Sequence, residues 1–168
     1  MRPFLMLPLL LAACVSSPRL EAPDPLAPAF SLQDFFVGRT EGAGILRVAL
    51  SSPKSVRVHG TGHIGPGGDL ILQQTVEEAG KPATQREWRI REDSPGHFVG
   101  TLSDAAGPVT AVVSGNRLRL RFQMKGGLEA EQSIYQKPGG QTAHNLMTVR
   151  KLGLAVATLD ETIKRAGK

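Results

Sequence analysis

The chain has 168 residues, which is enough for one domain of ordinary size and a short additional segment, and too few for two full domains. The net charge is +5 without any long block of like charges, so the composition favours weak attraction to anionic surfaces over dedicated nucleic-acid binding. A single cysteine excludes an internal disulfide and a metal site built from several thiolates. The 19 glycines and 12 prolines, with only 21% charged residues, favour an all-β domain.

The first residues have the pattern of a secretory signal peptide. A positive start at Arg2 precedes the apolar run Pro3–Ala13, which is too short to span a bilayer, since a span needs roughly 20 apolar residues. The sequence Leu-Ala-Ala-Cys, ending at Cys14, resembles the bacterial lipobox, in which the cysteine thiol receives a diacylglycerol. We therefore expect residues 1–13 to be a lipoprotein signal peptide and Cys14 to be lipidated, with the membrane as a partner through the N-terminal acyl chains.

Residues 14–29 are expected to form a lipidated cysteine and a Pro-rich tether. The segment contains four prolines and no periodic apolar face. In an extended, polyproline-like conformation it would hold the following domain about 45 Å from the lipid surface. By resemblance to other lipoproteins, Val15 after the cysteine implies sorting to the outer membrane, so the expected location is the cell envelope, on the periplasmic face of that membrane.

Residues 30–168 are predicted to be one β-barrel domain. Phe30–Phe36 fits a short helical turn that plugs one end of the barrel. The alternation of apolar and polar residues is clearest over Arg117–Lys125, and turn signals separate the other candidate strands. The positions predicted to face inward are Val56, Val58, Leu70, Leu72, Val76, Trp88, Ile90, Phe98 and Leu102. A meander of eight to ten short antiparallel strands most simply closes into an up-and-down barrel, because closure removes exposed edges; a two-sheet sandwich is the second choice.

Two turns predict the pairing of the central strands. A two-residue turn at Gly115-Asn116 pairs Ala111 with Leu120, so that the apolar sets coincide. A three-residue turn over Gly126–Leu128 pairs Leu120 with Ile134 and keeps the glutamates away from the apolar face.

The C-terminal segment fits two structures. Helical spacing relates Leu152, Val156, Leu159 and Ile163, whereas strand spacing relates Leu154, Val156 and Thr158. We expect a final strand that frays or turns into a short helix after Leu159.

Several short motifs occur in a characteristic order behind the lipobox. They are Phe35-Phe36-Val37-Gly38, Arg86-Glu87-Trp88, Gly96–Thr101 followed by Asp104 and Gly107, Gly115-Asn116, Ile134-Tyr135, and Asn145 followed by Lys151-Leu152-Gly153. Together they resemble an uncharacterised family of bacterial lipoproteins, known as a domain of unknown function, over roughly residues 30–160. The resemblance implies a lipocalin-like barrel and implies no activity, because the family has none established. Asp160–Lys164 departs from the apolar strand that the family usually has there.

The motifs that carry enzyme chemistry are weak in this chain. Gly60–Gly65 has the spacing of a dinucleotide fingerprint, but a glycine-rich turn follows in place of the helix that this motif requires. His59 and His63 lie about 13 Å apart in a regular strand, which is too far for two ligands of one metal. No Gly-x-Ser-x-Gly elbow is present. We expect no enzyme activity, no metal and no cofactor.

One row of cations has two interpretations. The row Arg117, Arg119, Arg121 and Lys125 can face anionic lipid, or it can be a solvated outer face paired with Glu129 and Glu131. The second interpretation is favoured.

A candidate ligand site consists of polar residues that the alternation places on the inner face, beside aromatic residues. The polar members are Gln74, Arg86 and Gln132, and the aromatic members are Trp88, Phe98 and Phe122. If the barrel is hollow, these groups can orient the polar head of a mostly apolar, lipid-like ligand. If it is filled, Arg86 stacks on Trp88 and the glutamines bond to the backbone. The sequence thus predicts a non-enzymatic binding lipoprotein, or a structural lipoprotein that docks another envelope component.

Overall fold

The computed structural model describes residues 15–24 and 27–167. The predicted signal peptide and Cys14 lie outside the described residues. The elements of the described chain are α1 (Leu32–Phe36), β1 (Gly38–Val48), β2 (Lys54–Ile64), β3 (Leu70–Glu78), β4 (Thr84–Ser94), β5 (His97–Leu102), β6 (Val109–Ser114), β7 (Arg117–Met124), β8 (Leu128–Gln136), β9 (Thr142–Lys151) and β10 (Leu154–Ala166). Within that part of the chain, no helix is both long and apolar enough to cross a membrane.

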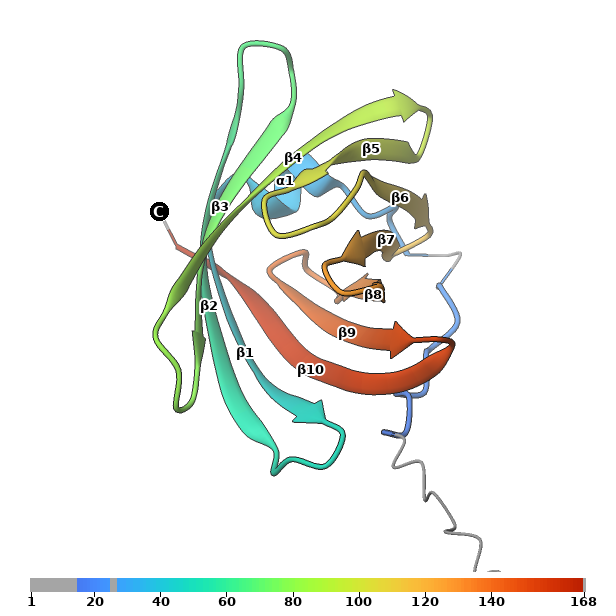
Figure 1. Ribbon diagram of the computed structural model, residues 1–168. Helices are drawn as coiled ribbons and strands as arrows, with labels where there is room; N and C mark the ends of the chain where they lie inside the picture. Colours follow the sequence, from blue (N-terminus) through green and yellow to red (C-terminus); the bar gives the residue numbers. More distant parts are fainter. Residues whose placement is uncertain (1–14, 25–26, 168) are drawn as a thin grey trace, which may run out of the picture.

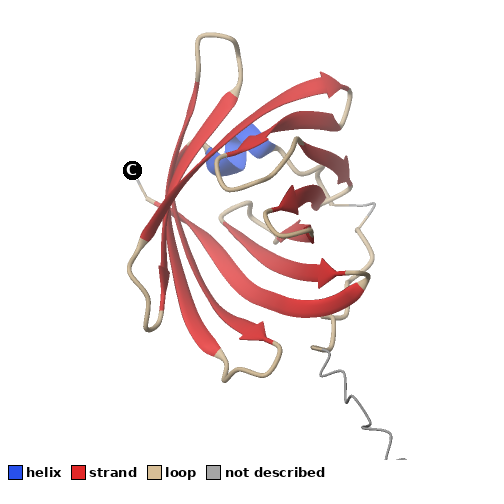
Figure 2. Ribbon diagram, in the orientation of Figure 1, coloured by secondary structure: helices blue, strands red, loops and turns tan. Residues whose placement is uncertain are grey.

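The ten strands form one closed antiparallel barrel (Figures 1 and 2). Each strand pairs with its neighbours in the sequence, and β10 pairs with β1 over ten residues of each strand, from Arg39 with Ala166 to Val48 with Ala157. Closure leaves no unpaired sheet edge, and this is the reason for which the sequence analysis favours a barrel for a meander of short strands. The prediction of an all-β, up-and-down barrel is confirmed, and the sandwich is excluded.

The helix α1 closes one end of the barrel. The Ser31 side chain caps it by accepting a hydrogen bond from the backbone N–H of Asp34 at 3.2 Å. Phe35 is completely buried, and its ring packs edge-on against Phe36 with the centroids 5.0 Å apart. We call this the plugged end; the opposite end, which carries the β1–β2, β3–β4, β5–β6, β7–β8 and β9–β10 turns, is the far end. The predicted helical plug is confirmed, with its helix starting at Leu32.

The inner face follows the predicted alternation. Seven of the predicted inward positions are buried and the other two, Val76 and Phe98, are half-buried. The main apolar cluster extends from α1 through the middle of the barrel, and a smaller cluster of Val56, Val58 and Leu159 lies towards the far end. The core is therefore concentrated near the plug.

The predicted strand register is correct at one turn and shifted at the next. Ala111 pairs with Leu120, as the Gly115-Asn116 turn predicts. Leu120 pairs with Gln132, however, and not with Ile134. The turn consists of Lys125–Gly127, because Gly126 and Gly127 adopt left-handed backbone conformations, φ 79° and 70°, that start the reversal one residue earlier than predicted. The shift is two residues, so every side chain keeps its predicted face.

The prediction of a short C-terminal helix is wrong. Strand β10 continues to Ala166, with Leu159, Glu161 and Ile163 facing inward and buried. Pairing on both sides, with β9 and with β1, satisfies the backbone groups of this strand and outweighs the helical spacing of its leucines.

The Pro-rich segment Val15–Asp24 contains no helix or strand, and it lies against the barrel instead of projecting from it. The Val15 N–H donates to the Ala155 carbonyl at 3.1 Å, and the buried Tyr135 hydroxyl donates to the Glu21 carbonyl at 2.8 Å. We call this segment the strap. It begins at the far end, beside the β9–β10 turn (Figure 1).

Candidate functional site

A small cavity of about 40 Å³ lies inside the barrel below α1. Apolar side chains of α1 and the strands form most of its wall, including Phe36, Leu72 and Trp88. The polar residues of the wall, which we call the polar belt, are Thr40, Gln74, Arg86, Gln132 and Glu161. The volume holds a few water molecules or a small chemical group, because one water needs only about 10–15 Å³ measured in this way.

Arg86 is the charged centre of the belt. Its Nε donates to Gln74 Oε1 at 2.8 Å, and Trp88 Nε1 donates to the same oxygen at 2.9 Å. The guanidinium also lies over the Trp88 ring, 5.7 Å from the centroid. The register explains the grouping, because Gln74 pairs directly with Arg86 across β3 and β4, and Trp88 is the next inward residue. Gln74 thus fixes both donors.

The positive charge of Arg86 is poorly compensated. Desolvation lowers the pKa of the guanidinium, while Asp104 and Glu161 act in the opposite direction. Neither carboxyl group forms an ion pair with Arg86, and the hydrogen bond of its side chain goes to the neutral amide of Gln74. Such a charge is costly inside a protein and favours an anionic partner.

Glu161 faces the cavity from β10. Asn145 Nδ2 donates to its Oε2 at 2.7 Å, and burial raises the pKa of the carboxyl group despite this hydrogen bond and the charge of Arg86. Gly42 on β1 makes room for it, since a Cβ at that position would collide with the carboxylate. A carboxyl group accepts hydrogen bonds in either state and donates one only when it is protonated, so the belt presents to the same cavity a cation and a carboxyl group whose pKa is raised.

The structure brings together four of the six predicted site residues directly. Gln74, Arg86, Trp88 and Gln132 all line the cavity. Phe122 supports them from behind, with its ring perpendicular to that of Trp88 and the centroids 5.5 Å apart. Phe98 does not reach the cavity; it lies in a separate surface groove beside Ser31 and Leu32 at the plugged end.

Residues 8–165 match the sequence pattern of the family described as Protein of unknown function (DUF3833). The chain belongs to this family. A search of curated proteins gives no match. The DUF3833 assignment covers the whole barrel and confirms the resemblance to an uncharacterised family noted from the sequence motifs.

Solved structures with the same architecture are lipocalin-like barrels of very different sequence. The S-type phycobiliprotein lyase CPES from Guillardia theta is 8% identical with a TM-score of 0.66, and the alignment covers 83% of this chain and 94% of the lyase. A DUF3598 protein of unknown function from Nostoc punctiforme is 12% identical with a TM-score of 0.58, and the alignment covers 83% of this chain and 50% of that one. At these identities the likeness shows the fold alone.

Two belt residues of this DUF3833 chain and one residue that supports them were missed by the sequence analysis. Thr40 and Glu161 belong to the belt, and Asn145 holds Glu161 in place. The signal for Glu161 was present, because strict alternation from Leu159 to Ile163 puts it inside. A helical interpretation of that segment hid the alternation.

The glycine-rich motif and the histidines have other roles in this structure. Gly60 and Gly62 lie within strand β2, where a Cβ would collide with Thr40 Oγ1 or with the Phe36 carbonyl of α1. Gly62 thus allows the plug to approach the strand closely, and Gly60 makes room for the Thr40 side chain of β1. His59 Nε2 lies 3.9 Å from Glu77 Oε1 on the outer face. No group of three or more metal-ligating side chains occurs in the described part of the chain.

The cation row lies on the outer face of β7. Arg119 and Arg121 both pair with Glu131, at 2.7 and 3.0 Å. This contact agrees with the interpretation of a solvated, charge-paired face. Burial is the largest single effect on Glu131 and raises its pKa, but the hydrogen bonds and charges of the two guanidinium groups together outweigh it, so the pKa is lowered.

Proposed function

We propose that this protein binds a mostly apolar, lipid-like ligand with an acidic head group inside its barrel, as a lipid-anchored lipoprotein of the cell envelope. The observation that carries the proposal is the Arg86 guanidinium, which lines the cavity, is oriented by Gln74 and Trp88, and has no ion-pair partner in the described residues. The planar guanidinium matches a carboxylate or phosphate through two parallel hydrogen bonds.

The rest of the cavity fits the same chemistry. An acidic head group would neutralise Arg86, and the Glu161 carboxyl group, whose pKa burial raises, would donate a further hydrogen bond to it when protonated. The remaining wall is largely apolar, as in most small-molecule sites.

The apolar part of the ligand needs more room than the cavity has. A cavity of about 40 Å³ accepts the head group and not an acyl chain. Residues at the far end of the interior are only half-buried, among them Leu46, Val76 and Met147. Met147 is flexible and repacks at low cost. We therefore propose that the chain of the ligand displaces these side chains and points to the far end.

The proposed activity is binding and not catalysis. The belt contains a guanidinium, amides, a carboxyl group and the Thr40 hydroxyl, but it lacks a nucleophile paired with a general base. The similarity to a phycobiliprotein lyase extends to the fold only. It supports the view that a barrel of this fold can belong to a protein that acts on another molecule.

The small cavity also favours a second candidate function. In that alternative the barrel is filled, Arg86 is satisfied by Gln74 and by stacking on Trp88, and the protein is a structural lipoprotein that docks another envelope component through its outer face.

Native mass spectrometry of the full chain, released from detergent, separates the two candidates. We expect an additional lipid-sized mass on the wild-type protein, at least tenfold less of it on Arg86→Met, and an unchanged amount on Arg91→Met. Arg91 is the matched control, because it is an exposed arginine on the outer face of the same strand. Protein without any bound mass, or equal loss in both variants, would favour the filled barrel.

The envelope location has a separate test. The variant Cys14→Ser should leave an unlipidated precursor, because the serine hydroxyl does not accept the diacylglycerol that a lipobox cysteine receives. Mature, membrane-bound protein from this variant would show that Cys14 is not the site of acylation. The outcome of the Cys14→Ser test does not change the outcome of the mass spectrometry. The proposal of ligand binding and the proposal of lipid anchoring are therefore tested separately.

A further inference from the structure

Two leucines stand at the tips of neighbouring hairpins at the far end of the barrel. Leu50 in the β1–β2 turn is 91% exposed and Leu152 in the β9–β10 turn is 93% exposed, more than any other large apolar residue of the described chain. The hairpins lie side by side because β1 pairs with β10, and the Ala49 N–H donates to the Val156 carbonyl at 2.9 Å. Val48 and Leu154, which are also exposed, extend the apolar surface of the two tips.

The backbone at both tips is unfavourable for leucine. Leu50 has φ 62° and Leu152 has φ 51°, and no other non-glycine residue of the described chain has a positive φ. Glycine or asparagine occupies this conformation at a lower cost. Each tip thus retains a bulky apolar side chain that lies outside the core and strains its own backbone, which indicates a role outside the fold.

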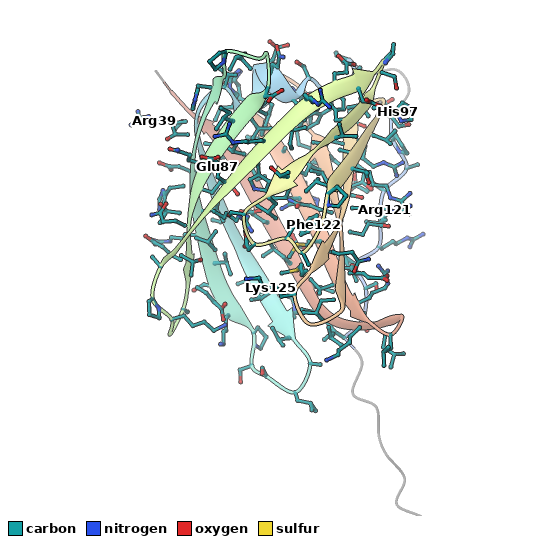
Figure 3. All side chains as sticks on the ribbon, turned by 45° about the horizontal axis from the view of Figure 1, so that its top comes forward. Arg39, Glu87, His97, Arg121, Phe122 and Lys125 are labelled. Atoms are coloured by element: carbon teal, nitrogen blue, oxygen red, sulfur yellow. The ribbon has the colours of Figure 1, made fainter. Side chains whose placement is uncertain are left out.

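Cations predominate in the far-end turns that flank these leucines, although Lys54 is paired with Glu78 at 3.0 Å. The ranges 47–54, 124–128 and 150–155 contain no acidic residue, and their cations are Arg47, Lys54, Lys125, Arg150 and Lys151. Acidic residues occur beside the other far-end turns, at Glu78 and Asp104, and in turns at the plugged end, for example Asp69 and Asp93. Figure 3 labels Lys125 in the lower half of the barrel and Arg39 and His97 at its upper end.

The strap also starts at this end. The Val15 N–H bonds to the Ala155 carbonyl, one residue from the Val156 carbonyl that holds the β1–β2 turn. Figure 1 shows the first described residues, in blue, between the two hairpins. Because Cys14 is bonded to Val15, acylation of Cys14 would attach the membrane anchor at the far end.

We propose that the far end of the barrel docks on a bilayer that contains anionic phospholipids, with Leu50 and Leu152 inserted among the lipid headgroups. Isolated apolar tips flanked by lysines and arginines suit a bilayer surface, because the apolar side chains enter the interface while the cations stay at the phosphates. The docked barrel presents its far end, and therefore the proposed exit for a ligand chain, directly to the lipid. The docking contact does not depend on whether a ligand binds at Arg86.

Fluorescence quenching by brominated lipid tests this contact in the full chain, reconstituted into phosphatidylcholine–phosphatidylglycerol vesicles. The only native tryptophan, Trp88, is buried in the barrel and gives the same background in each variant. We expect Leu50→Trp and Leu152→Trp to be quenched well beyond the wild type, and Ile64→Trp to match the wild type. Ile64 is the matched control, because it is an exposed apolar residue, 42% accessible, at the other end of strand β2. Vesicles of phosphatidylcholine alone should give weaker quenching at both tips.

Three results would overturn the proposal: a chain that does not float with the anionic vesicles, tip tryptophans quenched no more than the one at position 64, or equal quenching in neutral vesicles.

The double variant Leu50→Asn with Leu152→Asn separates membrane contact from a role in folding. Because asparagine tolerates the left-handed backbone, the thermal unfolding temperature of the double variant should equal or exceed that of the wild type. A fall in that temperature would assign the leucines to the fold and contradict the docking role. The variant Cys14→Ser should lose the acyl anchor. If the fraction of this variant that still binds vesicles keeps the tip quenching, the contact of the tips with lipid does not result from acylation alone.

Discussion

Glu161 is an acid inside the barrel, and its protonation links the stability of the protein to pH. Burial raises its pKa in the folded state above the ordinary value of 4.5. Between the unfolded and folded pKa values, the folded chain holds a proton that the unfolded chain has released. The contribution of Glu161 to the free energy of unfolding is therefore complete below the unfolded pKa and is lost as pH rises through the folded pKa.

The variant Glu161→Gln should remove this loss, because its amide is neutral at every pH and its oxygen still accepts the hydrogen bond from Asn145. In urea unfolding, the variant should gain on the wild type as pH rises from 4 to 8. The gain approaches about 1.4 kcal/mol for every pH unit that separates the two pKa values. The control Glu41→Gln, at an exposed position on β1, should leave the pH profile unchanged. Parallel profiles for the wild type and Glu161→Gln would show that folding does not raise the pKa of this carboxyl group.

Single residues also show how far the sequence predicts the site. Alternation places Gln74, Arg86 and Gln132 inside correctly, because strand geometry alone decides which face a side chain occupies. It does not reveal that Gln74 accepts from both Arg86 and Trp88, since that contact depends on the register between β3 and β4. It also places Phe98 against the core correctly, but it does not show that Phe98 lies in a separate groove and does not line the cavity.

At the level of elements, the strap depends on a few specific hydrogen bonds. Asn116 Oδ1 accepts from the Asp24 N–H at 3.0 Å, and the buried Tyr135 hydroxyl donates to the Glu21 carbonyl at 2.8 Å. We predict that Tyr135→Phe loosens the strap and lowers the free energy of unfolding by about 1 kcal/mol, the usual value of one such bond. Trypsin cleavage after Arg19, followed by mass spectrometry, should become faster.

Asn116→Ala should accelerate the same cleavage through the second contact, while Thr162→Ala, an exposed outer-face change on β10, should leave its rate unaltered. If neither strap variant changes the rate at Arg19, these hydrogen bonds do not hold the segment on the barrel. The sequence did not predict the docking of the strap, because its two prolines favour an extended backbone but do not specify the surface against which it lies.

The two predictions that failed among the elements have a common physical reason. Turn composition leaves open where the reversal starts, as at Lys125–Gly127, and a short amphipathic segment fits a helix or a strand until its neighbours are known, as at β10. In both cases tertiary pairing decided the outcome. The closed barrel could be predicted because closure satisfies every edge at once, whichever residues make the turns.

At the level of the whole molecule, a closed barrel with one plug should unfold as a unit. Each strand is bonded on both sides, so no strand can detach without opening the barrel, and the largest apolar cluster connects α1 to most of the strands. Phe35 lies at the centre of the plug, completely buried, with its ring centroid 5.6 Å from that of Phe30. Its loss should therefore be felt in distant strands.

We predict that Phe35→Ala lowers the free energy of unfolding by about 3–5 kcal/mol, because it removes a large buried ring and leaves a cavity. Hydrogen exchange should accelerate to a similar extent in the slowest amides of all strands, including β9 and β10, since these amides exchange only when the whole barrel opens. Leu50→Ala, which touches no core residue, should change the stability by no more than about 0.5 kcal/mol. Faster exchange confined to β2 and β3, next to α1, would instead show that the plugged end opens alone, and the barrel would then have a second route to its interior.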